Sequence, residues 1–152
     1  CNSDKNSISE NNILKIKTIL ENLALDNLKD WEPPFHEENF LKGFTQSSDF
    51  RFTVDGFHVN DFEKWKAIVY ESMEFDRQHH KQYKHNIIDI QTLVIGENSG
   101  VVTVNYIWDY ITNDDLHFNV PATVTSVYRF EDKNWKIVNS HVSHGEKRLL
   151  ED

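Results

Sequence analysis

The last strand-like segment of the chain carries the residues best suited to chemistry. Residues 135–146 read WKIVNSHVSHGE, which alternates like a β-strand but includes two histidines, His141 and His144. An imidazole that faces a binding site transfers protons near neutral pH, so it acts as a general acid or base. Strand alternation puts His141 and Ser143 on one face and His144 on the other, at the end of the strand. A histidine here also fits a purely structural role, buried and bonded to a neighbour.

Proton-transfer chemistry further requires a carboxylate that shares the site. The four aspartates beside the predicted strands are Asp49, Asp55, Asp89 and Asp109. Asp55 precedes Gly56 and is typical of a turn, whereas Asp89 and Asp109 fall on strand faces that alternation places outward. Only Asp49 is expected to reach a site near the first strand. The sequence therefore predicts no pair of inward-facing carboxylates, and His141 is the one catalytic candidate.

The segment HHKQYKH holds His79, His80 and His85. A zinc site needs ligands that converge on one point, and adjacent histidines point in different directions. We therefore expect no metal site here. The sequence also has no Gly-rich phosphate loop and no Ser-His-Asp order, so no cofactor is expected.

Charge and composition exclude some classes of partner. The 152 residues include 16 Lys and Arg against 25 Asp and Glu, a net charge of −9. A surface this acidic repels phosphate backbones, and the sequence has no basic cluster with interleaved aromatics that would offset the repulsion. We therefore expect no nucleic-acid binding. With one cysteine, no disulfide within the chain is possible.

That cysteine is Cys1, followed by the polar stretch NSDKNSISENN. A bacterial lipoprotein signal peptide leaves a lipid-modified cysteine as the new first residue. We therefore expect Cys1 to carry a lipid anchor, residues 1–8 to be a tether, and the protein to be membrane-anchored in a bacterial cell envelope. The alternative is a chain boundary that fell on Cys by chance.

Periodicity predicts helices first and a sheet afterwards. Ile13, Ile16, Leu20 and Leu23 recur at helical spacing, and Ser7 with Glu10 resembles a capping box, so residues ~9–30 should form an amphipathic helix. A short second helix should begin near Pro34 and end at Gly43, and a third should run from Asn60 to about Arg77.

Strands are predicted by alternation and by turn signals. One short strand precedes the Asp55–Gly56 turn, and four longer ones follow the third helix: HNIIDIQTLVI, VVTVNYIWDYI, LHFNVPATVTSVYRF and WKIVNSHVS. Short polar turns join them, so an antiparallel meander is expected. Pro121 lacks the N–H of a sheet ladder and predicts a bulge. The fold class is α+β, a curved antiparallel sheet wrapped around helices with a cavity at its wide end.

This order of elements, together with GENSGVVTVNYIWDYI, TSVYRFEDKNWKIVNSHVS and VDGFHVNDFEKWKAIV, resembles the nuclear transport factor 2-like superfamily and its SnoaL-like group. The ending W…H…H.S is similar to that of the calmodulin-dependent kinase II association domain. The resemblance covers residues 9–145 and leaves 146–152 as a tail. It implies a cone-shaped, cystatin-like roll with a pocket at the open end, and a homodimer formed through the outer sheet face.

The resemblance also implies which residues line the pocket. By similarity to the kinase domain, His141 should face the cavity. Arginines of that domain correspond to Tyr106 and Ser126, which carry no charge here, so the pocket should be aromatic and mostly apolar. The expected ligand-binding residues are Phe52, Trp65, Tyr106, Trp108, Ser126 and His141.

Three functions stay open at this point. The first is a lipid-anchored domain that binds a small, mostly apolar ligand. The second is a ketosteroid isomerase-like enzyme that acts on an apolar carbonyl compound by general acid/base catalysis through His141. The third is a dimerisation module with a vestigial cavity. Two titratable side chains facing each other in the cavity, one with a perturbed pKa, would favour the enzyme.

Overall fold

The structure, a computed structural model, describes residues 8–151. Two helices, a short hairpin and a third helix precede the four long strands, in agreement with the α+β prediction. The helices are α1 (Glu10–Asp30), α2 (Glu37–Lys42) and α3 (Phe62–His79). The strands are β1 (Arg51–Val54), β2 (Phe57–Val59), β3 (His80–Gly96), β4 (Ser99–Thr112), β5 (His117–Glu131), β6 (Asn134–His144) and β7 (Arg148–Leu150).

The two long helices begin at side-chain caps. Ser9 Oγ accepts the Asn12 backbone N–H at 3.3 Å, and a carboxylate oxygen of Asp61 accepts the Lys64 N–H at 2.9 Å. The sequence predicted the cap of α1 two residues earlier, at Ser7, and the cap of α3 one residue earlier, at Asn60. Ser7 lies outside the described residues, and Asp61 rather than Asn60 has the extended backbone of a cap.

The sheet has the order β2-β1-β6-β5-β4-β3, with β7 pairing β5. The predicted antiparallel meander of β3 to β6 is confirmed, but β1 pairs β6 in parallel, so the sheet is mixed. Strands β2 and β7 have three residues each and are too short to show periodicity. Strand β7 falls within the residues predicted to be a tail.

The bulge predicted at Pro121 is wrong. The register between β4 and β5 is regular through Pro121, which pairs with Ile107. The Pro121 carbonyl accepts the Gly145 N–H at 2.7 Å. In an antiparallel strand the N and O of one residue point to the same neighbour, so the missing N–H faces the gap between β6 and β7 and costs no ladder bond.

The bulge lies in β6 instead. Val127 of β5 pairs with Asn139, and the next residue, Tyr128, pairs with Ile137, so Val138 is an extra residue in β6. An extra residue reverses the alternation of every side chain that follows it. Ile137 and Ser140, three positions apart, are accordingly both buried.

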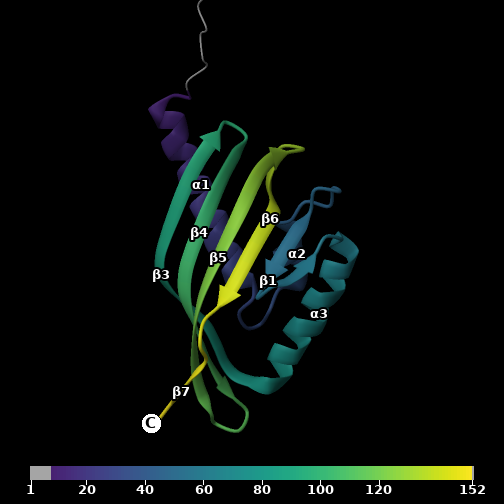
Figure 1. The fold of residues 1–152 in the computed structure, drawn as a ribbon, viewed down its shortest axis with the longest axis vertical. Coiled ribbons are helices and arrows are strands. Elements are labelled where there is room, and N and C mark those ends of the chain that lie inside the picture. The colour runs from purple at the N-terminus through teal and green to yellow at the C-terminus, as the bar shows by residue number, and fades with distance from the viewer. Residues whose placement is uncertain (1–7, 152) are drawn as a thin grey trace, which may run out of the picture.

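Helices α1 and α3 pack on the concave face of the sheet. Figure 1 shows α1 crossing behind β3, β4 and β5, with α3 beside the edge formed by β1 and β2. At Gly100 on β4 a Cβ atom would lie 2.4 Å from Leu20 Cδ1, so glycine permits the close approach of α1. The buried stripe of α3 contains Trp65, Val69 and Met73. Between these helices and the sheet the core stays open at one end.

The outer face of the sheet is partly polar. Thr123 Oγ1 donates to Asn105 Oδ1 at 2.6 Å, and Asn105 Nδ2 donates to Asp89 Oδ1 at 2.7 Å. The homodimer through this face stays a prediction.

Cys1 and its lipid anchor fall outside the described residues. Within residues 8–151, none of the helices combines the length and the apolar character needed to cross a membrane. The anchor and the envelope location therefore stay predictions from the sequence.

Candidate functional site

The open end of the core is a cavity of about 570 Å³. Its walls come from the end of α1, from α2, from one side of α3 and from the concave face of the sheet. The lining is mostly aromatic and aliphatic, with a few titratable side chains. The aromatic members are Trp31, Phe40, Phe44, Phe52, Trp65, Phe75, Tyr83, Tyr106 and Trp108, and the titratable ones besides the tyrosines are Glu71, Asp76, His85 and His144.

Four of the six predicted ligand-binding residues lie in this lining: Phe52, Trp65, Tyr106 and Trp108. The Phe52 and Trp65 rings stack at 3.7 Å between centroids with 22° between their planes. Ser126 is buried, but it lies outside the lining and its hydroxyl is 3.0 Å from Ser140 Oγ. Ser140 takes the place in the lining that Ser126 was predicted to have.

The prediction that His141 faces the cavity is wrong. The side chain of His141 is exposed, and His141 pairs with Thr53 and Thr125 on the outer face of the sheet. The bulge at Val138 is the physical reason, because it turns the odd-numbered residues that follow it in β6 outward. His144 lines the cavity instead.

A carboxylate holds His144 in place. Asp55 Oδ1 accepts the His144 backbone N–H at 2.8 Å, and Asp55 Oδ2 lies 2.7 Å from His144 Nδ1. Asp55 and Gly56 both have positive φ, 48° and 83°, as a two-residue hairpin turn of type I′ requires. Burial raises the pKa of Asp55, but the two hydrogen bonds from His144 outweigh it and lower the pKa below its usual value. Asp55 is thus a turn residue, as predicted, and also the partner of a cavity histidine.

Asp76 places a second carboxyl group in the cavity wall. The residue is 8% exposed, and Oδ2 accepts the Trp31 indole N–H at 2.9 Å. His80 Nδ1 lies 3.4 Å from the other carboxylate oxygen. Desolvation by burial raises the pKa of Asp76, and the Trp31 hydrogen bond and the charge of His80 offset only part of that rise.

His85 lies in the same wall, backed by Glu32 from the turn after α1. The His85 side chain is 6% exposed. Glu32 Oε1 accepts the His85 backbone N–H at 2.6 Å and lies 3.4 Å from Nδ1, too poorly aligned for a hydrogen bond to the ring. Burial raises the pKa of Glu32, but its contacts with His85 outweigh burial and lower it. Glu32 therefore stays ionised behind the imidazole.

Two tyrosines complete this wall. Burial raises the pKa of Tyr83 well above its usual value and that of Tyr106 to about 12, so both phenols stay neutral hydrogen-bond donors. The Tyr106 ring meets the His85 ring edge-on at 5.0 Å. Three further buried nitrogens of the lining, Trp65 Nε1, Trp108 Nε1 and His85 Nδ1, have no hydrogen-bond partner within the described residues.

The other aspartates considered from the sequence lie elsewhere. Asp49 pairs with Arg129 at 2.7 Å on the surface, so the expectation that it reaches the cavity is wrong. Asp89 and Asp109 face outward, as predicted, and Asp109 lies 3.1 Å from His117 Nε2. Among residues 8–151, no three His, Cys, Asp or Glu side chains are grouped so that they could hold a metal ion.

Sequence reasoning missed Asp76 and Glu32, considered His85 only as a metal ligand, and placed His144 on the face away from the cavity. A signal for Asp76 exists in the sequence, because it follows Met73 by three positions and Val69 by seven on the apolar stripe of α3. A carboxyl group in that register must be buried. No comparable signal distinguishes Glu32 or His144, whose partners come from distant segments of the chain.

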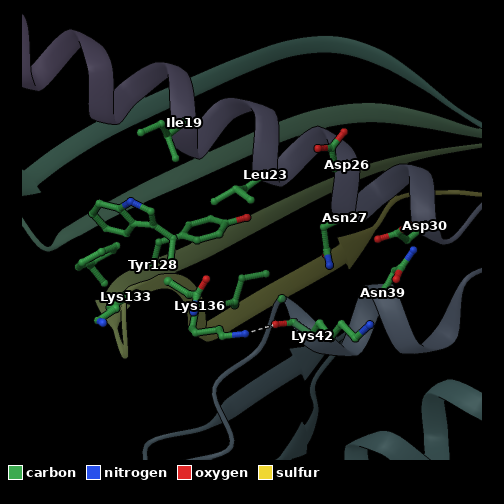
Figure 2. Close-up of a pocket in the computed structure, with 15 residues that line it drawn as sticks. Ile19, Leu23, Asp26, Asn27, Asp30, Asn39, Lys42, Tyr128, Lys133 and Lys136 are labelled. Atoms are coloured by element: carbon green, nitrogen blue, oxygen red, sulfur yellow. Dashed lines mark hydrogen bonds between the residues drawn. The ribbon is translucent and has the colours of Figure 1, made fainter.

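A second hollow, of about 550 Å³, lies between α1, α2 and the hairpin of β5 and β6 (Figure 2). Lys42, Lys133 and Lys136 stand on one rim and Asp26 and Asp30 on the other. The Lys136 ammonium group donates to the Lys42 carbonyl. The rim carries three lysines against two aspartates, and the hollow holds none of the buried acid–base pairs of the first cavity.

Buried Tyr128 lines this second hollow. Its hydroxyl has no hydrogen-bond partner within residues 8–151, and burial raises its pKa. The phenol therefore stays neutral.

Comparison with solved structures defines the fold. A candidate scytalone dehydratase from Novosphingobium aromaticivorans DSM 12444 is 12% identical, with a TM-score of 0.78 over 95% of this chain and 93% of its own. The hexachlorocyclohexane dehydrochlorinase LinA-type3 from Novosphingobium barchaimii LL02 is 14% identical, with a TM-score of 0.75 over 93% and 94%. An NTF-2 like protein of unknown function from Shewanella oneidensis MR-1 is 18% identical, with a TM-score of 0.61 over 82% and 95%.

The chain has the nuclear transport factor 2-like fold. The predicted resemblance is thereby confirmed at the level of the fold. No family model matches the sequence, and no match was found among curated proteins. The nuclear transport factor 2-like fold supplies the cone and its open end, and the side chains described above line it.

Proposed function

We propose that the cavity binds a small, mostly apolar molecule and removes a proton from it. One observation carries the proposal. Glu32 lies 3.4 Å from His85 Nδ1 and Asp76 lines the same cavity as His85, and the environments of the two carboxyl groups move their pKa values in opposite directions, lower for Glu32 and higher for Asp76. Two titratable groups whose pKa values are moved apart in this way mark the base side and the acid side of a site.

The lining supports the class of ligand. Stacked and edge-on aromatic rings favour a ring system or another flat apolar group. The unpartnered nitrogens of Trp65 and Trp108 are buried donors, which favour a ligand with one or two acceptor atoms. A dedicated anion site would need positively charged side chains, and the described lining contains no Lys or Arg.

The roles follow from the charges. His85 takes the proton, and ionised Glu32 behind it stabilises the imidazolium that forms. Asp76 keeps its proton to a higher pH than an ordinary aspartate, so with Tyr83 it donates hydrogen bonds to the negative charge that develops on the substrate. The result is a carbanion or enolate, which either accepts a proton elsewhere or expels a leaving group.

Two fold neighbours are named for reactions of the proposed kind. A dehydrochlorinase and a candidate dehydratase, by their names, both remove a proton together with a leaving group. At 12–14% identity they support the fold alone, so the reaction of this chain rests on its own side chains.

Two measurements test the proposal on the whole chain. The first is binding of the neutral dye N-phenyl-1-naphthylamine, whose fluorescence rises in an apolar cavity, by the wild type and by Phe52→Ala. The second is turnover of 5-nitrobenzisoxazole, a flat ring that opens when a base removes its C–H proton. We expect His85→Gln to slow turnover at least about 100-fold and to leave dye binding intact.

If the dye binds and His85→Gln has no effect on turnover, the result would support a binding protein and contradict the proton-transfer role of His85. If neither dye nor probe interacts with the wild type, the proposed function is wrong and the vestigial cavity is supported. His141→Gln, a histidine on the outer face, is the matched control and should change neither measurement.

A further inference from the structure

The cavity has a second imidazole, at its mouth, that the role of His85 does not use. His144 ends β6, and its side chain is 26% exposed, against 6% for His85. It lines the cavity and lies 5.8 Å from the Trp108 ring, between centroids. His144 therefore contacts both the interior of the cone and the solvent.

Asp55 fixes which nitrogen of His144 is free. An ionised carboxylate only accepts hydrogen bonds, so the 2.7 Å contact puts the proton on Nδ1 and leaves Nε2 to exchange a proton. The second carboxylate oxygen holds the His144 backbone N–H, and the Asp55 N–H donates to the Val142 carbonyl at 3.1 Å. Turn and strand end are thus joined at three points, and the ring is oriented before a ligand binds.

The sheet places His144 opposite His85. His85 on β3 pairs with Trp108 on β4, and His144 on β6 pairs with Ala122 on β5, which in turn pairs with Tyr106 on β4. Three strand spacings separate the two histidines, an arc of roughly 14 Å along the sheet. Because the face is concave, both rings point inward from opposite ends of this arc, with Tyr106 and Trp108 between them. The cavity they line, of about 570 Å³, has room for a small ring.

We propose that His144, positioned by Asp55, is the proton donor for the leaving group of the reaction, so that the cavity catalyses an elimination. This rests on the proposed function, in which His85 removes the first proton. As the C–H electrons form the new double bond, the bond to the leaving group breaks, and Nε2–H of His144 gives that group its proton. The leaving group departs toward solvent. His85 then releases the proton it took to solvent, and His144 Nε2 takes one up from solvent.

A pair of probes with different leaving groups tests this role. In 5-nitrobenzisoxazole the leaving phenolate is stabilised and needs little help from an acid, whereas in unsubstituted benzisoxazole it is more basic. We expect His144→Gln to slow the unsubstituted probe about 100-fold and the nitro probe less than about threefold. His85→Gln should slow both probes alike. A structural defect would not distinguish the two leaving groups.

Asp55→Asn keeps His144 and suits the turn, because asparagine tolerates positive φ. It should give the same selective loss at about tenfold, and circular dichroism should show both variants folded. His141→Gln should leave both rates unchanged. Equal losses on both probes, or no loss, in His144→Gln and Asp55→Asn would contradict the role of His144 while the role of His85 stands. A wild type no faster than His85→Gln on either probe would contradict the proposed function itself.

Discussion

The two walls of the cavity place the carboxyl groups of Asp76 and Asp55 in different environments. On the inner wall His85, Asp76 and Tyr83 are almost fully buried. Desolvation is the largest influence on the pKa of Asp76 and raises it. At the mouth Asp55 and His144 are partly exposed. Burial raises the pKa of Asp55, but the hydrogen bonds from His144 and the nearby histidine charges together outweigh burial and lower it. Burial favours neutral groups and hydrogen bonding to a carboxylate favours charged ones. One cavity can therefore hold a neutral acid and an ionised carboxylate at the same pH.

The largest difference between the walls should appear when a hydrogen bond is removed from each. On the inner wall, Trp31→Phe keeps an aromatic ring beside Phe40 but removes the indole N–H that Asp76 accepts. A buried carboxyl group that loses its donor costs about 1–3 kcal/mol. Urea denaturation at neutral pH should show that loss. A variant as stable as the wild type would mean that solvent reaches Asp76 and that the inner wall is not dry.

The pH dependence of stability should have opposite signs at the two carboxyls. The folded-state pKa of Asp76 is raised, so the folded state binds the proton more tightly, and the contribution of Asp76 to stability falls as pH rises from the usual aspartate pKa through the raised one. Removing the titration with Asp76→Asn should flatten the stability curve in that window. Denaturation midpoints from pH 3 to 8 measure this, and an unchanged slope would contradict the raised pKa.

Asp55 should behave in the reverse way and with a smaller effect. Its folded-state pKa is lowered, so its contribution is present above the usual aspartate pKa and is lost as pH falls through the lowered value. Half of the Asp55 side chain is exposed, so Asp55→Asn should cost only about 0.5–1 kcal/mol at pH 7. The cost should vanish at low pH and shrink in high salt. A cost that is independent of pH would show a loss of turn geometry instead of charge.

The smallest effect is expected outside both walls. His141 is exposed on the outer face, so His141→Ala should change the free energy of unfolding by less than about 0.5 kcal/mol. Thermal unfolding of His141→Ala beside His144→Ala compares the two faces of one strand. A larger loss in His141→Ala than in His144→Ala would reverse the assignment of faces in β6.

Much of the fold was readable because local patterns repeat over long segments. The apolar spacing of Ile13, Ile16, Leu20 and Leu23 predicted α1, and the alternation around Tyr106 and Trp108 placed both side chains on the concave face. The capping positions were displaced by one or two residues, since neighbouring polar residues compete for the same role. Strands of three residues left no pattern to detect.

The sequence by itself determined the class of fold, the concave aromatic lining and the Asp55–Gly56 turn, because each depends on residues close together in the chain. The tertiary structure decided the acid–base groups. One extra residue, Val138, turned His141 outward and His144 inward, and nothing local in β6 marks it. The partnerships of Glu32 with His85, Trp31 with Asp76 and Asp55 with His144 join segments 45 to 89 residues apart. Burial and long-range hydrogen bonds set those pKa values, and neither can be read from the order of residues.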